Sequence, residues 1–319
     1  MDCFNRKNSM EYREIGATDM KVSHISFGAS SLGGVFHSLR EEDGIKAVHT
    51  AVENGINFID VSPYYGYLKA ETVLGKALKE IDRKAYYLST KVGRYGKDGA
   101  NHWDYSARKA TESVYESMER LNVDYLDLIN VHDIEFADLD VVCQETLPAL
   151  VELREKGIVR HVGITNLTLR HFKYVIDHVP AGTVESVLSF CHYCLNDDAL
   201  VDYLDYFEEK GIGVINAAPF SMGLLTERGV PEWHPAPKPL IDVCRRAADY
   251  CRANGKSIEQ LAVKYAVSNP RIATTLFSTT RPEAVLQNIR WANEPLDEDL
   301  LIAVQRILEP RFRDTWLNS

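Results

Sequence analysis

Short apolar segments alternate with longer amphipathic ones along this chain, from about residue 25 to residue 293. Eight of the short segments are rich in β-branched or aromatic residues and are predicted strands: Ile25–Ala29, Asn57–Asp60, Tyr86–Val92, Leu126–His132, His161–Asn166, Ser186–Tyr193, Gly213–Pro219 and Thr274–Thr279. The segments between them repeat apolar residues at helical spacing, as in Ile45, Val48 and Val52. Alternation of this kind is typical of parallel βα units.

Three of the predicted helices end at the same sequence, a glycine followed by an isoleucine. The pairs are Gly55-Ile56, Gly157-Ile158 and Gly211-Ile212. A glycine at such a position can take the left-handed conformation that ends a helix, after which the isoleucine starts the return to a strand. Ser106 is the predicted N-cap of the helix that begins at Ala107.

Eight βα units without a dividing linker predict one α/β domain over residues 1–319, a (β/α)₈ barrel whose core spans about residues 25–293. A doubly wound open sheet is the competing fold, but the glycines after the first strand lack the G-x-G-x-x-G spacing. Three additions lie outside the repeat: an N-terminal hairpin (Tyr12–Val22), a long insert after the seventh strand (Leu225–Pro239) and a C-terminal extension from Glu294.

Composition and charge narrow the class of protein. The chain is 45% hydrophobic and 26% charged, which is typical of a globular protein. Acidic side chains outnumber basic ones by 46 to 36, so the formal net charge is −10, and neither nucleic acid nor an anionic membrane is an expected partner. We find no secretory signal at the N-terminus and no apolar run of ~20 residues, so we expect a cytoplasmic protein. We also expect it to be a monomer or a homodimer.

One cysteine spacing needs its own interpretation. Cys191-His192-Tyr193-Cys194 has the C-x-x-C spacing of a zinc knuckle or a redox pair, but no second C-x-x-C follows to complete four metal ligands. We therefore expect no metal, and interpret both cysteines as free thiols at the end of a buried strand.

The predicted strand ends carry a short set of ionisable groups. Asp60 ends the second strand, Tyr65 follows five residues later, Lys91 ends the third strand and His132 the fourth. Side chains at this end of a barrel form its active site. An ammonium ion lowers the pKa of a neighbouring phenol, so Lys91 would activate Tyr65 as an acid or base, with Asp60 orienting Lys91. His132 would hydrogen-bond an alcohol or carbonyl oxygen beside Tyr65.

These residues lie in motifs that resemble the aldo-keto reductase family. The motifs occur in order, as Gly55 to Asp60, Tyr64-Tyr65-Gly66, Ser89-Thr90-Lys91 and Val131-His132-Asp133. The resemblance covers roughly residues 11 to 310. It implies a barrel that binds a nicotinamide cofactor across its strand ends, with Tyr65 as general acid and base and Asp60, Lys91 and His132 supporting it.

The resemblance also implies where the cofactor binds. Asn166 would hold the nicotinamide amide, and Ser189 lies where family members often have glutamine. The adenosine end would contact Ser278, Thr279, Thr280, Arg281, Gln287 and Asn288, the pyrophosphate would contact Pro219, Phe220, Ser221, Met222, Gly223 and Leu224, and Gly28, Ala29 and Ser30 would line the first strand end. Ala217 replaces a tyrosine that commonly stacks on the nicotinamide ring.

The resemblance favours NAD over NADP. Members that prefer NADP commonly bring a lysine and an arginine to the 2′-phosphate, and here Ser278 and Ala284 occupy those positions. A phosphate dianion without two cations is poorly held. Arg281 leaves NADP possible.

Further motifs resemble aldose dehydrogenases within the family, among them the plant L-galactose dehydrogenases; they include His132-Asp133-Ile134-Glu135-Phe136 and Pro231-Glu232-Trp233-His234-Pro235. The implied reaction oxidises C1 of an aldose such as L-galactose, L-fucose or D-arabinose to the lactone. Candidate sugar contacts are Tyr64, Tyr95, Trp103, His192 and Trp233. Two alternatives stay open: an NADPH-dependent aldehyde or ketone reductase, and a nucleotide-sensing regulatory subunit.

Overall fold

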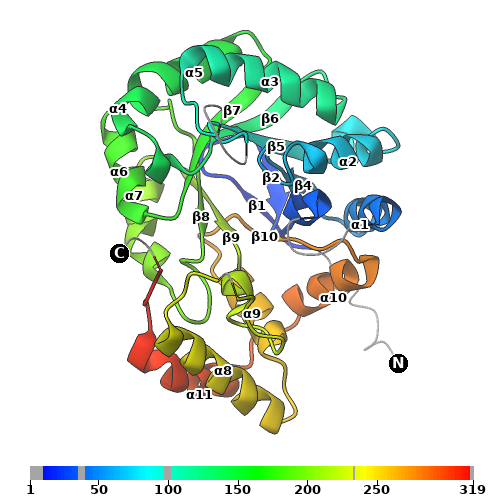
Figure 1. Ribbon diagram of the computed structural model, residues 1–319, viewed down its shortest axis with the longest axis vertical. Coiled ribbons are helices and arrows are strands. Elements are labelled where there is room, and N and C mark those ends of the chain that lie inside the picture. The colour runs from blue at the N-terminus through cyan, green and yellow to red at the C-terminus, as the bar shows by residue number, and fades with distance from the viewer. Residues whose placement is uncertain (1–9, 35–39, 97–101, 233, 317–319) are drawn as a thin grey trace, which may run out of the picture.

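Eight parallel strands form a closed barrel at the centre of the structure, a computed structural model that describes residues 10–34, 40–96, 102–232 and 234–316 (Figure 1). In their order around the barrel the strands are β10 (Thr274–Phe277), β3 (Ile25–Gly28), β4 (Phe58–Asp60), β5 (Tyr87–Val92), β6 (Leu126–Val131), β7 (Val159–Asn166), β8 (Ser186–Phe190) and β9 (Gly213–Ala217). The predicted barrel and its eight strands are confirmed. Five of the eight strands end one to three residues earlier than predicted.

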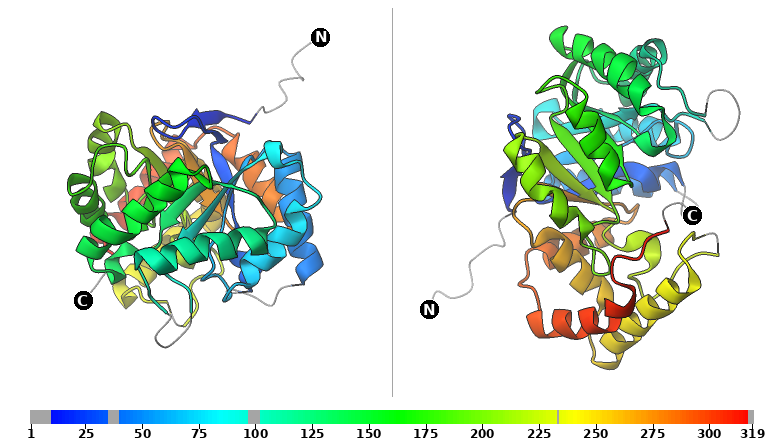
Figure 2. Two further views of the ribbon diagram at one scale, coloured as in Figure 1. Left: turned by 90° about the horizontal axis from the view of Figure 1, so that it is seen from above. Right: turned by 90° about the vertical axis from the view of Figure 1, so that its left-hand side faces the viewer.

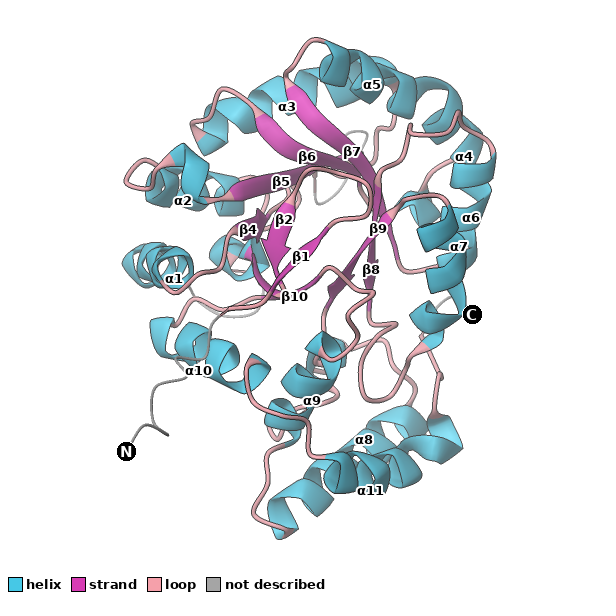
Figure 3. Ribbon diagram, turned by 180° about the vertical axis from the view of Figure 1, so that it is seen from behind, coloured by secondary structure: helices cyan, strands magenta, loops and turns pink. Residues whose placement is uncertain are grey.

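Helices surround the barrel on the outside (Figure 3). They are α1 (Glu41–Glu53), α2 (Lys69–Leu78), α3 (Ala107–Leu121), α4 (Leu139–Val141), α5 (Leu147–Glu155), α6 (Leu169–Asp177), α7 (Leu204–Glu209), α8 (Lys238–Ala253), α9 (Ile258–Val267), α10 (Pro282–Ala292) and α11 (Glu298–Leu308). The predicted stops are confirmed, since Gly55, Gly157 and Gly211 have φ values of 93°, 74° and 69°. The predicted cap is also confirmed, with Ser106 Oγ accepting a hydrogen bond from the Lys109 amide.

The predicted N-terminal hairpin is present and lies across one end of the barrel (Figure 2). It consists of β1 (Tyr12–Glu14) and β2 (Lys21–Ser23). Ile15, Met20 and Val22 are buried in one cluster with side chains from the barrel strands, namely Phe58, Leu128, Leu188, Ile215 and Leu276. The hairpin therefore closes the end of the barrel at which the parallel strands begin.

The two remaining additions lie on one side of the barrel. A 3₁₀ turn (Ser221–Gly223) follows β9, and the described residues of the insert then form neither helix nor strand before α8. The predicted end of the insert at Pro239 is the second residue of that helix. The C-terminal extension forms α11, which packs against α8 (Figure 1). In the part of the chain that the structure describes, we find no helix with the length and apolar character of a membrane span.

Candidate active site

Three ionisable side chains predicted from the sequence meet at the carboxyl ends of β4, β5 and β6. Asp60 is the last residue of β4, Lys91 lies near the end of β5, and His132 directly follows β6. Their exposed fractions are only 2%, 1% and 4%. Because neighbouring parallel strands end at the same edge of the barrel, residues far apart in the sequence share one buried site.

Lys91 is held by a buried ion pair. Its Nζ donates to Asp60 Oδ2 at 2.5 Å and to the Val61 carbonyl oxygen at 2.7 Å. Asp60 Oδ1 accepts from Ser89 Oγ at 2.9 Å, and Ser89 Oγ in turn accepts from Asn130 Nδ2 at 3.0 Å. Burial lowers the pKa of Lys91, but Asp60, Tyr65 and Asp133 together more than offset this, so the pKa is raised and the amine stays protonated.

Tyr65 lies in the turn after β4 and packs against Lys91, whose Nζ is 5.1 Å from the centroid of the phenol ring. Burial raises the pKa of Tyr65, and Lys91 lowers it through its charge and its hydrogen bond. Burial is the larger effect, so the pKa lies above the ordinary value of 10.0. Lys91 therefore has the expected effect on the pKa of Tyr65, but burial outweighs it.

The loop that carries Tyr65 is in direct backbone contact with the 3₁₀ turn after β3. A Cβ added at Gly33 would lie 2.7 Å from both the Tyr65 carbonyl carbon and the Gly66 amide nitrogen. Gly66 itself has a φ of 61°, and a Cβ there would lie 2.2 Å from the Gly33 carbonyl oxygen. Only glycine at both positions permits this approach.

His132 lies beside Tyr65, with the two ring planes at 88° and the centroids 5.8 Å apart. Its Nδ1 is 3.1 Å from Ser62 Oγ. Burial, followed by the charges of Lys91 and Arg94, lowers the pKa of His132 well below 6.5. The imidazole is therefore neutral, and with Ser62 at Nδ1 its Nε2 can donate a hydrogen bond to a ligand.

Arg94 and Asp133 form a second ion pair at the carboxyl end of the barrel, and the sequence analysis predicts no role for it. Arg94 Nη1 donates to Asp133 Oδ2 at 2.7 Å, and Asp133 Oδ1 lies 3.5 Å from His132 Nε2. The Arg94 guanidinium carbon is 3.4 Å from the centroid of the Tyr64 ring and 4.5 Å from that of Trp103. The available signal was position alone, since Arg94 follows Lys91 by three residues and Asp133 directly follows His132.

The five predicted sugar contacts have different surroundings. Tyr64 and Trp103 lie at the mouth, and the Tyr64 ring centroid is 6.3 Å from that of His132. Tyr95 packs into the hydrophobic core, where its hydroxyl accepts a hydrogen bond from the Gly93 amide at 2.8 Å. His192 is buried after β8 with Nδ1 3.0 Å from Asp197 Oδ2, and its Nε2 has no hydrogen-bond partner among the described residues. Trp233 lies outside the described residues.

The side chains expected at the nicotinamide end are at the carboxyl ends of β7 and β8. Asn166 is fully buried, and both ends of its amide are engaged, with Oδ1 accepting from the Glu135 amide and Nδ2 donating to the Thr168 carbonyl. Ser189 is also fully buried, but its hydroxyl has no partner within the described part of the chain. A buried hydroxyl without a partner at a strand end fits a ligand that supplies one.

The loop expected to hold the pyrophosphate has an unusual backbone. It follows β9, and three of its non-glycine residues, Ala218, Ser221 and Met222, have left-handed φ values of 55°, 49° and 54°. Left-handed conformations in residues with side chains are costly and cluster at ligand sites. Its other predicted residues, Pro219, Phe220, Gly223 and Leu224, are buried or half-buried. This backbone fits a loop shaped around a ligand.

The residues expected at the adenosine end meet where β3 pairs with β10. Ser278 Oγ accepts from Ser30 Oγ and from the Ser31 amide, both at 2.9 Å. Gly28 and Ala29 are buried at the same edge. The remaining predicted residues lie in or near the start of α10 and are half-buried or exposed: Thr279, Thr280, Arg281, Gln287 and Asn288.

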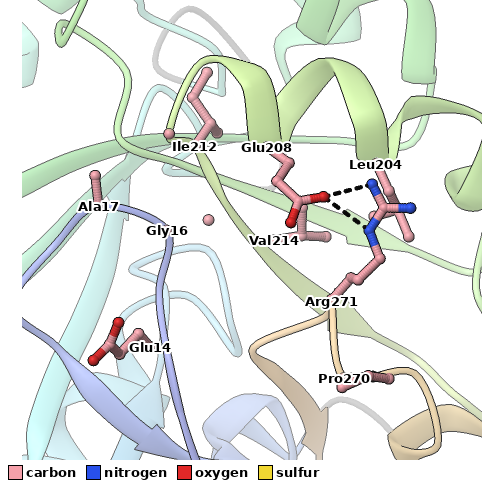
Figure 4. Close-up of a pocket in the computed structure, with 11 residues that line it drawn as sticks. Glu14, Gly16, Ala17, Leu204, Glu208, Ile212, Val214, Pro270 and Arg271 are labelled. Atoms are coloured by element: carbon pink, nitrogen blue, oxygen red, sulfur yellow. Dashed lines mark hydrogen bonds and ion pairs between the residues drawn. The ribbon is translucent and has the colours of Figure 1, made fainter.

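A separate cavity of about 350 Å³ lies at the hairpin end of the barrel (Figure 4). It is lined by Gly16 and Ala17 of the hairpin, Val214 at the start of β9, and an ion pair between Arg271 and Glu208. Because the strands begin here, this cavity is at the opposite end from Asp60, Lys91 and His132, and we do not assign it to the active site.

Comparison with known proteins agrees with this geometry. The family model for the aldo/keto reductase family matches residues 24–309. L-galactose dehydrogenase of Arabidopsis thaliana is 45% identical over 313 residues, covering 96% of this chain and 97% of the relative. D-arabinose 1-dehydrogenase of Saccharomyces cerevisiae is 34% identical over 262 residues, covering 77% and 76%.

A solved structure is also similar. An aldo-keto reductase from Bacillus halodurans superposes with a TM-score of 0.79 at 26% identity, covering 94% of this chain and 96% of that one. Since the family model, the relatives and the structure each match most of the chain, this protein belongs to the aldo/keto reductase family and is an oxidoreductase.

Proposed function

We propose that this enzyme oxidises the C1 hydroxyl of an aldose to the corresponding lactone with NAD. The observation that carries the proposal is the group formed by buried Asp60, Lys91 and His132 and half-buried Tyr65 at the carboxyl end of the barrel. The substrate class is supported by relatives named for L-galactose and D-arabinose oxidation, of which the first is 45% identical to this chain.

Enzymes of this family use nicotinamide cofactors, which supply the acceptor or donor of a hydride when bound. We assign the nicotinamide end to Asn166 and Ser189, the pyrophosphate to Pro219–Leu224, and the adenosine end to Ser278, Arg281 and their neighbours. The unpartnered Ser189 hydroxyl and the left-handed backbone after β9 support this assignment.

In the proposed oxidation, the C1 hydroxyl lies between Tyr65 and His132. Tyr65, as phenolate, accepts the hydroxyl proton, and the hydride leaves from C1, so the hemiacetal carbon becomes the lactone carbonyl carbon. Lys91 stabilises the phenolate, and Asp60 keeps Lys91 charged and in place. Neutral His132 donates a hydrogen bond to the reacting oxygen.

The proposed preference for NAD rests on the residues near the 2′-hydroxyl position. Ser278 is bonded to Ser30 and Ser31, and Ala284 carries no charge, so this edge offers hydroxyls where a phosphate dianion needs cations. Arg281 lies nearby, but its side chain is 71% exposed and pairs loosely with Glu283 at 3.7 Å. Equal kcat/KM values with NAD⁺ and NADP⁺ would contradict this preference.

One observation favours a second candidate, an aldehyde or ketone reductase. Tyr65 packs against both Lys91 and His132, and this arrangement also suits a protonated phenol that donates to a carbonyl oxygen during reduction. The same four residues serve both directions, so the substrate decides between the two functions.

An assay with both cofactors separates the candidates. We expect NAD⁺ reduction with L-galactose, L-fucose or D-arabinose, and weaker activity with their epimers. If no aldose in this panel is oxidised while simple aldehydes are reduced with NADPH, the reductase is the correct function.

A further inference from the structure

The Arg94–Asp133 ion pair lies next to the nitrogen of His132 that is available to a ligand. Ser62 occupies His132 Nδ1, so Nε2 is the nitrogen left for the reacting oxygen. Asp133 Oδ1 is 3.5 Å from that Nε2. A substrate atom bonded to the reacting carbon therefore falls within reach of the Asp133 carboxylate.

The two oxygens of this carboxylate have different neighbours. Arg94 Nη1 donates to Oδ2, while Oδ1 lies 3.5 Å from His132 Nε2. Both side chains are mostly buried, with exposed fractions of 21% for Arg94 and 9% for Asp133. A ligand hydroxyl that donates to Oδ1 would stabilise this mostly buried carboxylate.

A comparable pair at the other end of β6 shows what a purely structural arrangement looks like. Arg83 also lies over two aromatic rings, with its guanidinium carbon 3.9 Å from the Tyr125 ring centroid and 4.9 Å from that of Tyr86. Its partner Asp127 uses both oxygens, since Oδ2 accepts from Arg83 and the Leu88 amide and Oδ1 accepts from Arg160. Asp133 also pairs with an arginine that lies over aromatic rings, but its Oδ1 faces His132 Nε2 at 3.5 Å, where Asp127 Oδ1 binds a second arginine.

The surroundings of Asp133 match the chemistry of a polyhydroxylated substrate. Tyr64 and Trp103 hold the Arg94 guanidinium between them, and Phe136, which is 57% exposed, stacks on Trp103 at 4.5 Å. A carboxylate accepts hydrogen bonds from hydroxyls, while aromatic faces pack against the C–H groups of a sugar. The pair is therefore suited to a carbon chain that carries hydroxyl groups.

We propose that Asp133, positioned by Arg94, binds the hydroxyl on the carbon next to the reacting carbon, so that the enzyme selects 2-hydroxy substrates over their 2-deoxy analogues. The inference deepens the proposed function, because an aldose carries such a hydroxyl at C2. In this arrangement the C2 hydroxyl donates to Asp133 Oδ1 while the C1 oxygen accepts from His132 Nε2. Arg94 is a positioning residue, and Asp133 is the contact.

The test compares substrates that differ by this hydroxyl alone. In the direction of reduction the pair is lactaldehyde and propanal, and in the direction of oxidation it is L-galactose and 2-deoxy-L-galactose. We expect the wild-type enzyme to prefer the 2-hydroxy member by ~10- to 100-fold in kcat/KM, the size expected for a hydrogen bond to a charged group. In Asp133→Asn the ratio should fall towards one.

Asparagine suits this variant because residue 133 has a left-handed φ of 47°, which asparagine tolerates. Arg94→Met should reduce the ratio in the same way, because the carboxylate loses its fixed position. Arg83→Met is the matched control, since it breaks the corresponding pair at the other end of β6 and should lower thermal stability without changing the ratio. A ratio measured on one preparation does not depend on how much of the protein is folded.

An unchanged ratio in Asp133→Asn, or a wild-type enzyme that does not discriminate between lactaldehyde and propanal, would overturn this inference. Its failure is distinguishable from failure of the proposed function. If aldoses are not oxidised but the lactaldehyde preference is present and depends on Asp133, only the proposed function fails. If aldoses are oxidised and the ratio ignores Asp133, only this inference fails.

Discussion

Lys91 Nζ and Asp60 Oδ2 are 2.5 Å apart in a site where both side chains are almost fully buried. Removing one partner leaves the other charge buried and uncompensated, so Lys91→Met should lower the free energy of unfolding by about 3–5 kcal/mol. Asp60→Asn should destabilise the fold in the same direction. Urea unfolding of each variant measures the effect.

The double variant Asp60→Asn/Lys91→Met serves as the control for this pair. It removes both charges, so it should regain much of the lost stability and still have almost no turnover. A double variant as unstable as Lys91→Met would show that the stability loss has another cause than the unpaired carboxylate.

Tyr65→Phe tests the proposed acid and base directly. The change removes only the hydroxyl, so the fold and the affinity for the cofactor should be retained, as measured by fluorescence titration. Turnover should fall by at least ~10²–10⁴-fold, the range that general acid–base catalysis contributes. Near-normal turnover in this variant would refute the role of Tyr65.

The low pKa of His132 should decrease the free energy of unfolding as the pH falls below 6.5. Its pKa is well below 6.5 in the folded protein because of burial, whereas in the unfolded chain it is near 6.5. As the pH drops below 6.5, the unfolded chain gains a proton that the folded protein does not bind, so the free energy of unfolding decreases. The difference between wild type and His132→Asn, measured by urea unfolding across this range, isolates the effect. A difference that does not change with pH would contradict the neutral state of His132.

His161 should behave in the opposite way. It lies on β7 near the hairpin, 2.8 Å from both Asp19 and Glu185. Burial lowers the pKa of His161, but the two carboxylates outweigh it and the pKa is raised above 6.5. The stabilisation by protonated His161 is therefore complete below pH 6.5 and is lost as the pH rises through the folded-state pKa. His161→Gln should destabilise the protein more in mild acid than in mild base.

Much of the fold could be predicted from the sequence because its signals are local. Gly55, Gly157 and Gly211 end helices through their own backbone conformation, and Ser106 caps a helix with its own side chain. The short apolar strands are separated by amphipathic helices, a pattern that permits few folds other than a barrel. The hairpin is also predicted, but its packing against the end of the barrel where the strands begin is not, because that packing depends on contacts between distant segments.

The site was predictable only in part. Because they lie at predicted strand ends, Asp60, Lys91 and His132 were expected at the carboxyl edge of the barrel, and the structure has them there. The net pKa of Tyr65 was not predictable, because burial is a property of the folded surroundings. The link between Arg94 and Asp133 joins residues 39 positions apart, and no local pattern in the sequence indicates it. Their roles, like those of the cofactor and sugar contacts, stay predictions.

The contact between Gly33 and Gly66 has a consequence for mutational tolerance. Neither residue carries a functional group, yet a methyl group on either would collide with the opposite backbone and push the Tyr65 loop away from the barrel. Reacting groups must be held within about 0.5 Å of their productive position. A saturation mutagenesis screen for activity should therefore find substitutions at Gly33 and Gly66 as harmful as substitutions at the buried ion pair. The cause would be the backbone contact between the two turns and not the loss of a reactive side chain.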